Sequence, residues 1–178
     1  AKVRGVSTRT IAAAGWRDAK SLRLETATGV YTLHTDGPKI EKVFEMPAGT
    51  EAHVYRKGDD AVAYVLDHDV FVKVGDKTTR VTNNGFRWLT HGVAVSRVEF
   101  GITDGLWWSP DGGKIAFYEE DFRPIDAHAM VDWTAKPEPA KAKNDRYPMA
   151  GRKGSIVRIA VHDVNENKTV WLDIDERK

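Results

Sequence analysis

One stretch of this sequence decides the fold: residues 99–112 read EFGITDGLWWSPDG, and residues 115–118 read IAFY. The two tryptophans at positions 107 and 108 end one predicted strand, and the next strand begins at Lys114. Between them, Pro110 presets the φ angle of a tight turn, and Gly112 can adopt the positive φ that closes it. The stretch therefore predicts a strand, a tight turn and a second strand.

Short apolar runs with a period of two residues continue this pattern along most of the chain. Leu22 and Leu24 alternate with Arg23 and Glu25, as in a strand with one buried face. Turn residues separate the runs and predict a meander of short strands. Further predicted strands cover residues 30–33, 40–44, 62–66, 70–74, 79–82, 156–161 and 168–172. Helical periodicity is indicated only at residues 10–20.

A faint internal repeat organises these strands. Ala63-Tyr64 and Ala116-Phe117 occupy equivalent places in similar phrases, and residues 55–59 look like a degenerate copy of residues 108–112. A period of about forty to fifty residues with about four strands per unit is typical of a propeller blade. The sequence therefore predicts an all-β fold, a partial β-propeller of about three four-stranded antiparallel blades.

Residues 121–154 interrupt this pattern with prolines, alanines and lysines and no sustained alternation. We interpret them as a long loop between two strands of one blade. Loops of this length are uncommon in compact domains and are often functional. The composition alone leaves two interpretations open, a binding element and an excursion without a role.

The composition is that of a single globular domain covering residues 1–178, with 41% hydrophobic and 30% charged residues. The net charge is +1 and the two signs are interspersed, so the chain lacks the electrostatic footprint of a protein that binds nucleic acid or an anionic membrane. The absence of cysteine excludes disulfides, thiolate metal sites and a cysteine nucleophile. No apolar run is long enough to span a bilayer.

Sequence motifs for catalysis are missing. A nucleophile elbow needs G-x-S-x-G, and neither Ser109 nor Ser155 has the flanking glycines. Asp67-His68-Asp69 and Asp126-Ala127-His128 contain metal-binding residue types, but single triplets of this kind are usually turn residues. The acidic residues 119–121 would alternate between the faces of a strand, and we interpret them as a solvated entry to the loop. We therefore expect no catalytic residue, metal site or cofactor in this chain.

Glu99 stands in a different context, between Val98 and Phe100 and just before the predicted turn 101–105. A carboxylate among apolar neighbours is costly unless it is paired or faces water or a cavity. The local pattern leaves two interpretations open: a strand-end glutamate that reaches solvent, or a carboxylate with a function.

Three blocks of residues, in a fixed order, resemble a known family. The first is residues 63–73, AYVLDHDVFVK; the second is EFGI at 99–102 with residues 105–112 and 115–118; the third is RYPMAG at 146–151 with the strands 157–161 and 169–173. Many propellers contain the WSPDG phrase, whereas the acidic-Phe element before it and the RYPxAG element after it make the match specific. Over roughly residues 20–175, the chain resembles the N-terminal β-propeller region of dipeptidyl peptidase IV-like serine peptidases, in the prolyl oligopeptidase class.

This resemblance implies an eight-bladed propeller that caps an α/β-hydrolase domain and gates access to a buried cavity. In that family a glutamate pair projects into the cavity and binds the free α-amino group of the peptide substrate. Glu99 matches the second glutamate of the pair, whereas Val98 stands at the first position, which leaves dipeptide and tripeptide release both open. The catalytic Ser-Asp-His triad belongs to the hydrolase domain, so the resemblance implies a non-catalytic segment of a periplasmic or secreted peptidase.

The expected partners are the amino terminus of a peptide substrate and the C-terminal hydrolase domain. We also expect self-association through open sheet edges, since unpaired edge strands invite pairing. An alternative hypothesis is a free-standing propeller-like interaction module without peptidase activity, in which Glu99 is an ordinary surface residue and residues 121–154 bind the partner. A metal-dependent hydrolase that uses His68 or His128 is a third hypothesis.

Overall fold

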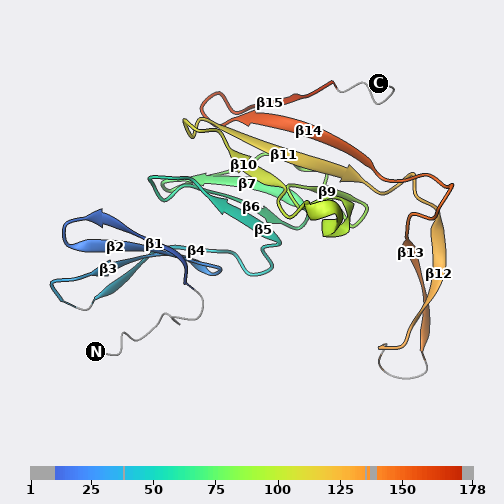
Figure 1. Cartoon of the computed structure of the whole chain (residues 1–178), viewed down its shortest axis with the longest axis horizontal. Coiled ribbons are helices and arrows are strands. Elements are labelled where there is room, and N and C mark those ends of the chain that lie inside the picture. Colours follow the sequence, from blue (N-terminus) through green and yellow to red (C-terminus); the bar gives the residue numbers. More distant parts are fainter. Residues whose placement is uncertain (1–10, 38, 135, 137–139, 174–178) are drawn as a thin grey trace.

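The computed structural model describes residues 11–37, 39–134, 136 and 140–173, and nearly all of its regular elements are β-strands. Three antiparallel sheets follow one another along the chain (Figure 1). Sheet 1 contains β1 (Ile11–Asp18), β2 (Ser21–Thr26), β3 (Gly29–His34) and β4 (Ile40–Glu45). Sheet 2 contains β5 (Ala52–Tyr55), β6 (Val62–Leu66), β7 (Asp69–Val74) and β8 (Lys77–Arg80).

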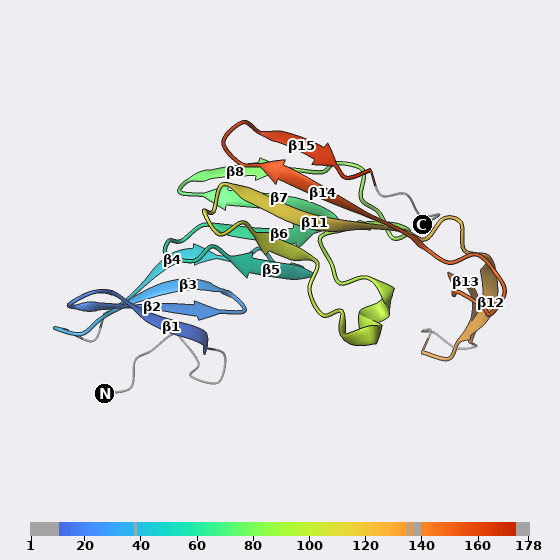
Figure 2. The same cartoon turned by 45° about the horizontal axis from the view of Figure 1, so that its top comes forward.

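Sheet 3 has the order β10 (Leu106–Trp108), β11 (Lys114–Asp121), β14 (Ile156–Asp163) and β15 (Lys168–Trp171). A short further strand, β9 (Leu89–His91), pairs with the end of β11. In Figure 2 sheet 1 lies below sheets 2 and 3, which overlap in that view, and the buried clusters place sheet 2 between sheets 1 and 3. The prediction of about three four-stranded antiparallel blades is confirmed.

The helical periodicity at residues 10–20 was misleading. Residues 11–18 form β1, which pairs with β2 in an antiparallel register that joins Trp16 to Leu22. Residue 10 lies outside the described residues. Hydrogen bonding to a neighbouring strand outweighs the local preference of an alanine-rich segment, since helix propensity is a weak prior that tertiary context overrides.

Sheet 2 explains why β6 is a continuous apolar run rather than an alternating one. Ala63 and Val65 pack in a core that sheet 2 shares with sheet 3. Val62 and Tyr64 point to the opposite face, where they pack with Met46 from the segment that follows sheet 1. A strand that is buried on both faces needs apolar residues at every position.

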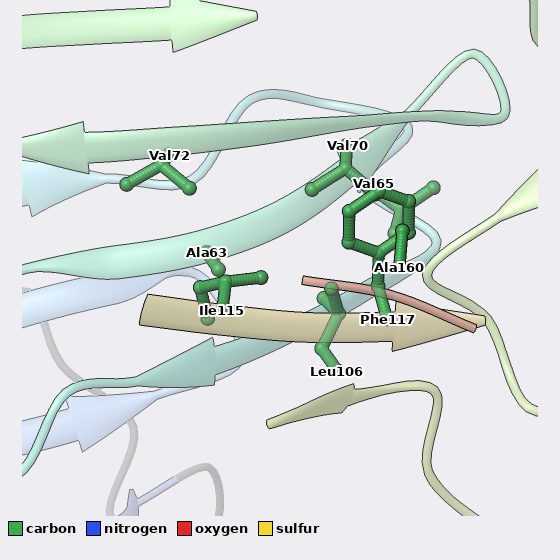
Figure 3. Close-up of a cluster of buried hydrophobic side chains, with 8 residues drawn as sticks. All are labelled: Ala63, Val65, Val70, Val72, Leu106, Ile115, Phe117 and Ala160. Carbon is green, nitrogen blue, oxygen red and sulfur yellow. The ribbon is translucent and has the colours of Figure 1, made fainter. Parts of the chain in front are cut away.

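The core between sheets 2 and 3 is drawn in Figure 3. Side chains from both sheets converge in it, and its fully buried members on β11 are Ile115 and Phe117. Phe117 also makes an edge-to-face contact with Trp171 of β15, with ring centroids 5.8 Å apart. The remaining buried members are Ala63, Val65, Val70, Val72, Leu106 and Ala160.

The turn predicted at WSPDG is present between β10 and β11. Gly112 has a φ of 70°, its N–H donates to the Ser109 carbonyl at 2.8 Å, and the Asp111 carboxylate accepts from the Ser109 hydroxyl at 2.5 Å. The repeat is also confirmed, because Tyr55 pairs with Val62 in sheet 2 as Trp108 pairs with Ile115 in sheet 3. The two turns touch: the Arg56 guanidinium donates to the Gly112 carbonyl at 2.9 Å.

Residues 121–154, expected to be a loop, contain a β-hairpin made of β12 (Ala127–Asp132) and β13 (Lys141–Arg146). The hairpin leaves from the end of β11 and projects away from the sheets (Figure 1). Most of its side chains are exposed, so no buried face imposes an apolar alternation on the sequence. Residues 135 and 137–139, which include two of the prolines used in that prediction, lie outside the described residues.

Within the described residues, no helix has the length and apolar character that crossing a membrane requires.

Candidate functional site

Glu99 lies in a short segment between β9 and β10, η2 (Ser96–Gly101), which we call the Glu99 segment. Figure 1 draws it as the coiled ribbon beside β9. Two tight turns form it: the Val98 N–H donates to the Val95 carbonyl at 3.2 Å, and the Ile102 N–H donates to the Glu99 carbonyl at 3.1 Å. Of the two interpretations left open for Glu99, the one that placed it at a strand end is wrong about the backbone, because Glu99 lies in a turn, although its side chain does reach solvent.

The backbone of the Glu99 segment is unusual. Ser96, Arg97, Val98 and Phe100 have φ values of 53°, 57°, 58° and 59°. The left-handed region costs a non-glycine residue about 1–2 kcal/mol, and a β-branched residue such as Val98 is rare there. Val98 is 61% exposed and Phe100 is 88% exposed, so side-chain packing does not offset this cost. Strain of this kind concentrates at functional sites, where the surrounding structure maintains it.

The Glu99 side chain is exposed, and its backbone is extended, with φ −76° and ψ 169°. Its carboxylate makes no ion pair with any residue that the structure describes. The segment thus presents a free negative charge to the solvent, while left-handed residues on both sides define its backbone.

A buried carboxylate lies at the start of the Glu99 segment. Glu120 of β11 is only 3% exposed, and its Oε1 accepts hydrogen bonds from the Ser155 hydroxyl at 2.6 Å and from the Ser96 N–H at 3.4 Å. Ser155 immediately precedes β14. One carboxylate therefore connects β11, β14 and the start of the Glu99 segment.

An aromatic side chain supports the same segment from another part of the chain. The Arg97 guanidinium carbon lies 4.6 Å from the centroid of the Tyr147 ring. Tyr147 belongs to the RYPMAG block and follows β13 directly. The structure thus brings the third block of the sequence resemblance into contact with Arg97, two residues before Glu99.

A buried polar network lies on the other side of β11. His91 is fully buried, and its Nε2 lies 3.1 Å from the Glu119 carboxylate, which is also 3.2 Å from the Arg158 guanidinium. The His91 Nδ1 lies 3.0 Å from the His68 carbonyl and 3.5 Å from the carboxylate of Asp69. The network joins sheet 2 to sheet 3.

Asp69 is completely buried at one end of this network. Its burial alone would raise its pKa, but hydrogen bonds from Arg80 at 2.6 Å, Thr82 at 2.6 Å and the Gly85 N–H at 3.0 Å outweigh burial and lower the pKa below its usual value. Asp69 is therefore ionised at neutral pH.

The solvated entry that was predicted for residues 119–121 is wrong for two of its three carboxylates. Glu119 and Glu120 are buried on opposite faces of β11, each with its own partners. Asp121 is partly buried, and its hydrogen bonds from Arg123 lower its pKa. The predicted alternation between faces is confirmed, but both faces of β11 are covered at this point.

The residues considered for metal binding or nucleophilic chemistry do not come together. His68 lies in the β6–β7 turn with its Nδ1 3.0 Å from Glu51, and His128 is on β12 in the projecting hairpin. Ser109 is in the β10–β11 turn, and Ser155 is bound to Glu120. Among the described residues, no group of three or more His, Asp or Glu side chains has the arrangement that holds a metal ion.

A groove of about 790 Å³ lies between the β5–β6 and β10–β11 turns, at the end of β10 opposite to Glu99. Arg56 pairs with Asp59 inside this groove, and the Asp111 carboxylate is held by its own turn. Because these charged groups already pair with neighbouring groups of the same turns, the groove is a less suitable candidate site than the Glu99 segment.

The sequence model of a protein family, described as the dipeptidyl peptidase IV (DPP IV) N-terminal region, matches residues 17–178 of the chain. The chain belongs to this family. The earlier resemblance, drawn from three short blocks, is thereby confirmed over nearly the whole sequence.

Curated relatives of this DPP IV N-terminal region include two proteins named "probable dipeptidyl-aminopeptidase B". The one from Podospora anserina is 26% identical over 133 residues, which are 66% of this chain and 14% of that protein. The one from Chaetomium globosum is 28% identical over 130 residues, which are 65% of this chain and 14% of that protein. The chain therefore spans only a small part of the length of these relatives.

Solved structures give the same picture of the fold. A candidate dipeptidyl aminopeptidase IV from Bacteroides ovatus superposes with a TM-score of 0.72 and 28% identity, over 90% of this chain and 22% of that one. Porphyromonas gingivalis dipeptidyl peptidase 4 superposes with a TM-score of 0.68 and 22% identity, over 92% of this chain and 23% of that one. The second likeness shows the fold alone.

In this DPP IV N-terminal region, the sequence pointed to Glu99 but not to Glu120 and Tyr147, which contact the Glu99 segment at Ser96 and Arg97. Glu120 and Tyr147 are far from Glu99 in sequence. The register of β11 and β14 brings Ser155 to Glu120, whereas Tyr147 reaches Arg97 from the end of β13. The one available signal was the RYPMAG block, and its contact with the Glu99 segment becomes visible only in the structure, where Tyr147 lies beside Arg97.

Proposed function

We propose that this chain is the substrate-gating, amino-terminus-recognising segment of a DPP IV-like exopeptidase, and that Glu99 binds the α-amino group of the peptide. The observation that carries the proposal is the exposed Glu99 carboxylate, which pairs with no residue in the described part of the chain and lies on a strained segment. Family membership supplies the class of protein in which such a carboxylate would act.

The chemistry of the proposal is a charge-assisted hydrogen bond. An ammonium group has three N–H donors and the Glu99 carboxylate accepts without being able to donate, so the pair is complementary in charge and in hydrogen bonding. The contact weakens when the amino group is acylated, since the positive charge and two of the donors are lost. A carboxylate in this position therefore selects free amino termini.

Peptide cleavage itself would be performed by a hydrolase domain outside this chain. The relatives are several times longer than the matched segment, and sequence motifs for a serine nucleophile are missing from this sequence. In this proposal the chain limits which peptides reach the nucleophile and how they are aligned.

The test is Glu99→Gln in the full-length peptidase that contains this chain. Charged hydrogen bonds contribute about 1.5–3 kcal/mol, so kcat/KM for peptides with a free amino terminus should fall about 10- to 100-fold. The matched control is Glu166→Gln, which removes an exposed carboxylate in the turn between β14 and β15. That control should leave kcat/KM unchanged.

Peptides with an acetylated amino terminus provide the second half of the test. Their cleavage should be slow in the parent protein and should not fall further in Glu99→Gln, because the contact is already missing. An equal loss for free and acetylated peptides would show that Glu99 acts on something other than the amino group and would contradict the proposal.

The alternative function is an interaction module without peptidase activity, and one observation favours it. The β12–β13 hairpin exposes Met130 and Val131, and Trp133 next to it is 82% exposed. This alternative predicts that the full-length protein cleaves no peptide with a free amino terminus, whatever residue stands at position 99.

A further inference from the structure

Two features of the chain remain outside the proposed function: the RYPMAG block and the buried Glu120. Both lie at the root of the excursion between β11 and β14, where the β12–β13 hairpin leaves the sheet and returns to it. Both also touch the Glu99 segment, Tyr147 through Arg97 and Glu120 through Ser96.

Hydrogen bonds and aromatic packing of Arg146 hold the root of the hairpin against the segment that precedes β12. Arg146, next to Tyr147, donates hydrogen bonds to the carbonyl oxygens of Arg123 at 2.9 Å and of Ile125. Ile125 is only 1% exposed, and the Arg146 guanidinium also lies 5.6 Å from the Trp88 ring. Arg146 therefore ties the chain next to Tyr147 to the segment that leads from β11 into β12.

Tyr147 contacts the Glu99 segment through a cation–π interaction with Arg97. Arg97 is exposed and lies with its guanidinium carbon 4.6 Å from the ring centroid, which is well within the range of such contacts. Arg97 has a left-handed backbone, two residues before Glu99. A contact that holds Arg97 therefore helps to maintain a conformation that the residue would otherwise leave.

Glu120 fixes the start of the same segment. Its Oε1 accepts from the Ser96 N–H and from the Ser155 hydroxyl, and the carboxylate is almost completely buried. Loss of this acceptor would leave a backbone N–H and a hydroxyl without their partner. The start and the end of the excursion thus both contact the segment.

We propose that Tyr147 and Glu120 are positioning residues that hold the Glu99 segment in its left-handed conformation. The role of the segment in binding amino termini rests on the proposed function; the positioning itself does not. Tyr147, near the root of the excursion rather than at its exposed tip, is then the residue of 121–154 that serves recognition.

Hydrogen–deuterium exchange of the full-length protein tests the positioning directly. The reporters are the amides of Val98 and Ile102, which close the two turns of the segment. Tyr147→Ala should make both exchange about 2- to 5-fold faster, the factor expected from loss of an exposed cation–π contact. Tyr147→Phe keeps the ring and should exchange like the parent protein.

Glu120 is tested with Glu120→Gln and Glu120→Leu. Glutamine keeps an oxygen acceptor and should preserve slow exchange, whereas leucine removes the acceptor and should accelerate exchange at Ser96 and Val98. If Glu120→Leu does not fold, Ser155→Ala is measured in its place. Ser155→Ala removes the hydrogen bond from the Ser155 hydroxyl to Glu120, which at 2.6 Å is the shorter of the two bonds that Glu120 accepts. Unchanged exchange in Tyr147→Ala and in the Glu120 or Ser155 variant would overturn the proposal.

Steady-state kinetics separates this proposal from the proposed function. Tyr147→Ala should raise KM about 2- to 5-fold for peptides with a free amino terminus, with kcat unchanged and acetylated peptides unaffected. Faster exchange in Tyr147→Ala together with full activity of Glu99→Gln would support the positioning and overturn the role of Glu99. A loss of selectivity in Glu99→Gln without any change of exchange in Tyr147→Ala would do the reverse.

Discussion

The two faces of sheet 2 are packed in different ways, although the same strands supply both. Towards sheet 3, Val65 and Val70 are fully buried against Phe117 in a continuous apolar core. Towards sheet 1, a smaller buried cluster of Val62, Tyr64 and Met46 is completed by half-buried rings. Sheet 2 is therefore held more firmly on one side than on the other.

The charged groups are also more deeply buried between sheets 2 and 3 than between sheets 1 and 2. Asp69, His91 and Glu119 are buried where sheet 2 meets sheet 3. Between sheets 1 and 2, Asp60 accepts from Arg17 at 2.7 Å and from Arg23 at 2.9 Å, with its side chain 25% exposed. Water and salt therefore screen the second group more strongly than the first. Burial, rather than the number of ion pairs, decides what each interface contributes.

The largest expected effect is that of Phe117→Ala. Phe117 is fully buried between sheets 2 and 3, and truncation of a buried phenylalanine costs about 3–5 kcal/mol because of lost transfer energy and an unfilled cavity. Phe44→Ala is the matched change at the other interface, where the ring is only partly buried. Its cost should be clearly smaller in denaturant unfolding followed by tryptophan fluorescence.

Equal losses for Phe117→Ala and Phe44→Ala would contradict the difference between the interfaces. Such a result would mean that the sheet 1 side is packed as tightly as the sheet 3 side, despite its half-buried rings.

Asp69→Asn should have the second-largest effect, about 1.5–3 kcal/mol at pH 7, because three hydrogen bonds to a buried carboxylate are weakened. The pKa of Asp69 is lowered in the folded chain, since its hydrogen bonds outweigh burial. Its contribution is therefore fully present above the unfolded pKa of about 4 and is lost as the pH falls through the folded pKa.

Unfolding free energies measured between pH 7 and pH 3 check this prediction. The difference between the parent and Asp69→Asn should shrink below about pH 4, since asparagine does not titrate. A difference that stays constant down to pH 3 would show that the lost stability does not arise from the ionised carboxylate.

Most strands of the three sheets could be predicted from the sequence because each follows a local rule. The alternation at Leu22 and Leu24, the run at residues 62–66 and the turn at Pro110 and Gly112 need only short-range information. The strand β1 and the hairpin β12–β13 could not be predicted in this way. Both are largely exposed, so their strand conformation arises from pairing with a neighbour and leaves no apolar pattern.

The candidate site could be predicted only in part. Glu99 stood out as an acidic residue between Val98 and Phe100, but its left-handed neighbours carry no sequence signature, since valine is among the residues least expected at positive φ. The buried state of Glu119 and Glu120 depends on His91 and Ser155 being brought to β11 by strand register. Register between distant strands is a property of the whole sheet and cannot be derived from one segment.

The smallest expected effect is that of Arg17→Ala at the interface between sheets 1 and 2. Arg17 binds both oxygens of Asp60, at 2.7 and 2.8 Å, but Asp60 keeps Arg23 as a second partner when Arg17 is removed. Partly exposed ion pairs contribute about 0.2–1 kcal/mol, and the loss should lie in that range and decrease in high salt.

Arg56→Ala is the matched change on the other side of sheet 2. Arg56 donates to the Gly112 carbonyl at 2.9 Å and lies 5.1 Å from the Trp108 ring, and no other described side chain makes either contact. Its loss should cost about 1–2 kcal/mol, and the part due to these two contacts should remain in high salt, which screens mainly the ion pair of Arg56 with Asp59. If Arg17→Ala and Arg56→Ala lowered the free energy of unfolding equally in 1 M salt, the charged contacts between sheets 1 and 2 would be as strong as those between sheets 2 and 3. That result would contradict the conclusion that sheet 2 is held more firmly on the side of sheet 3.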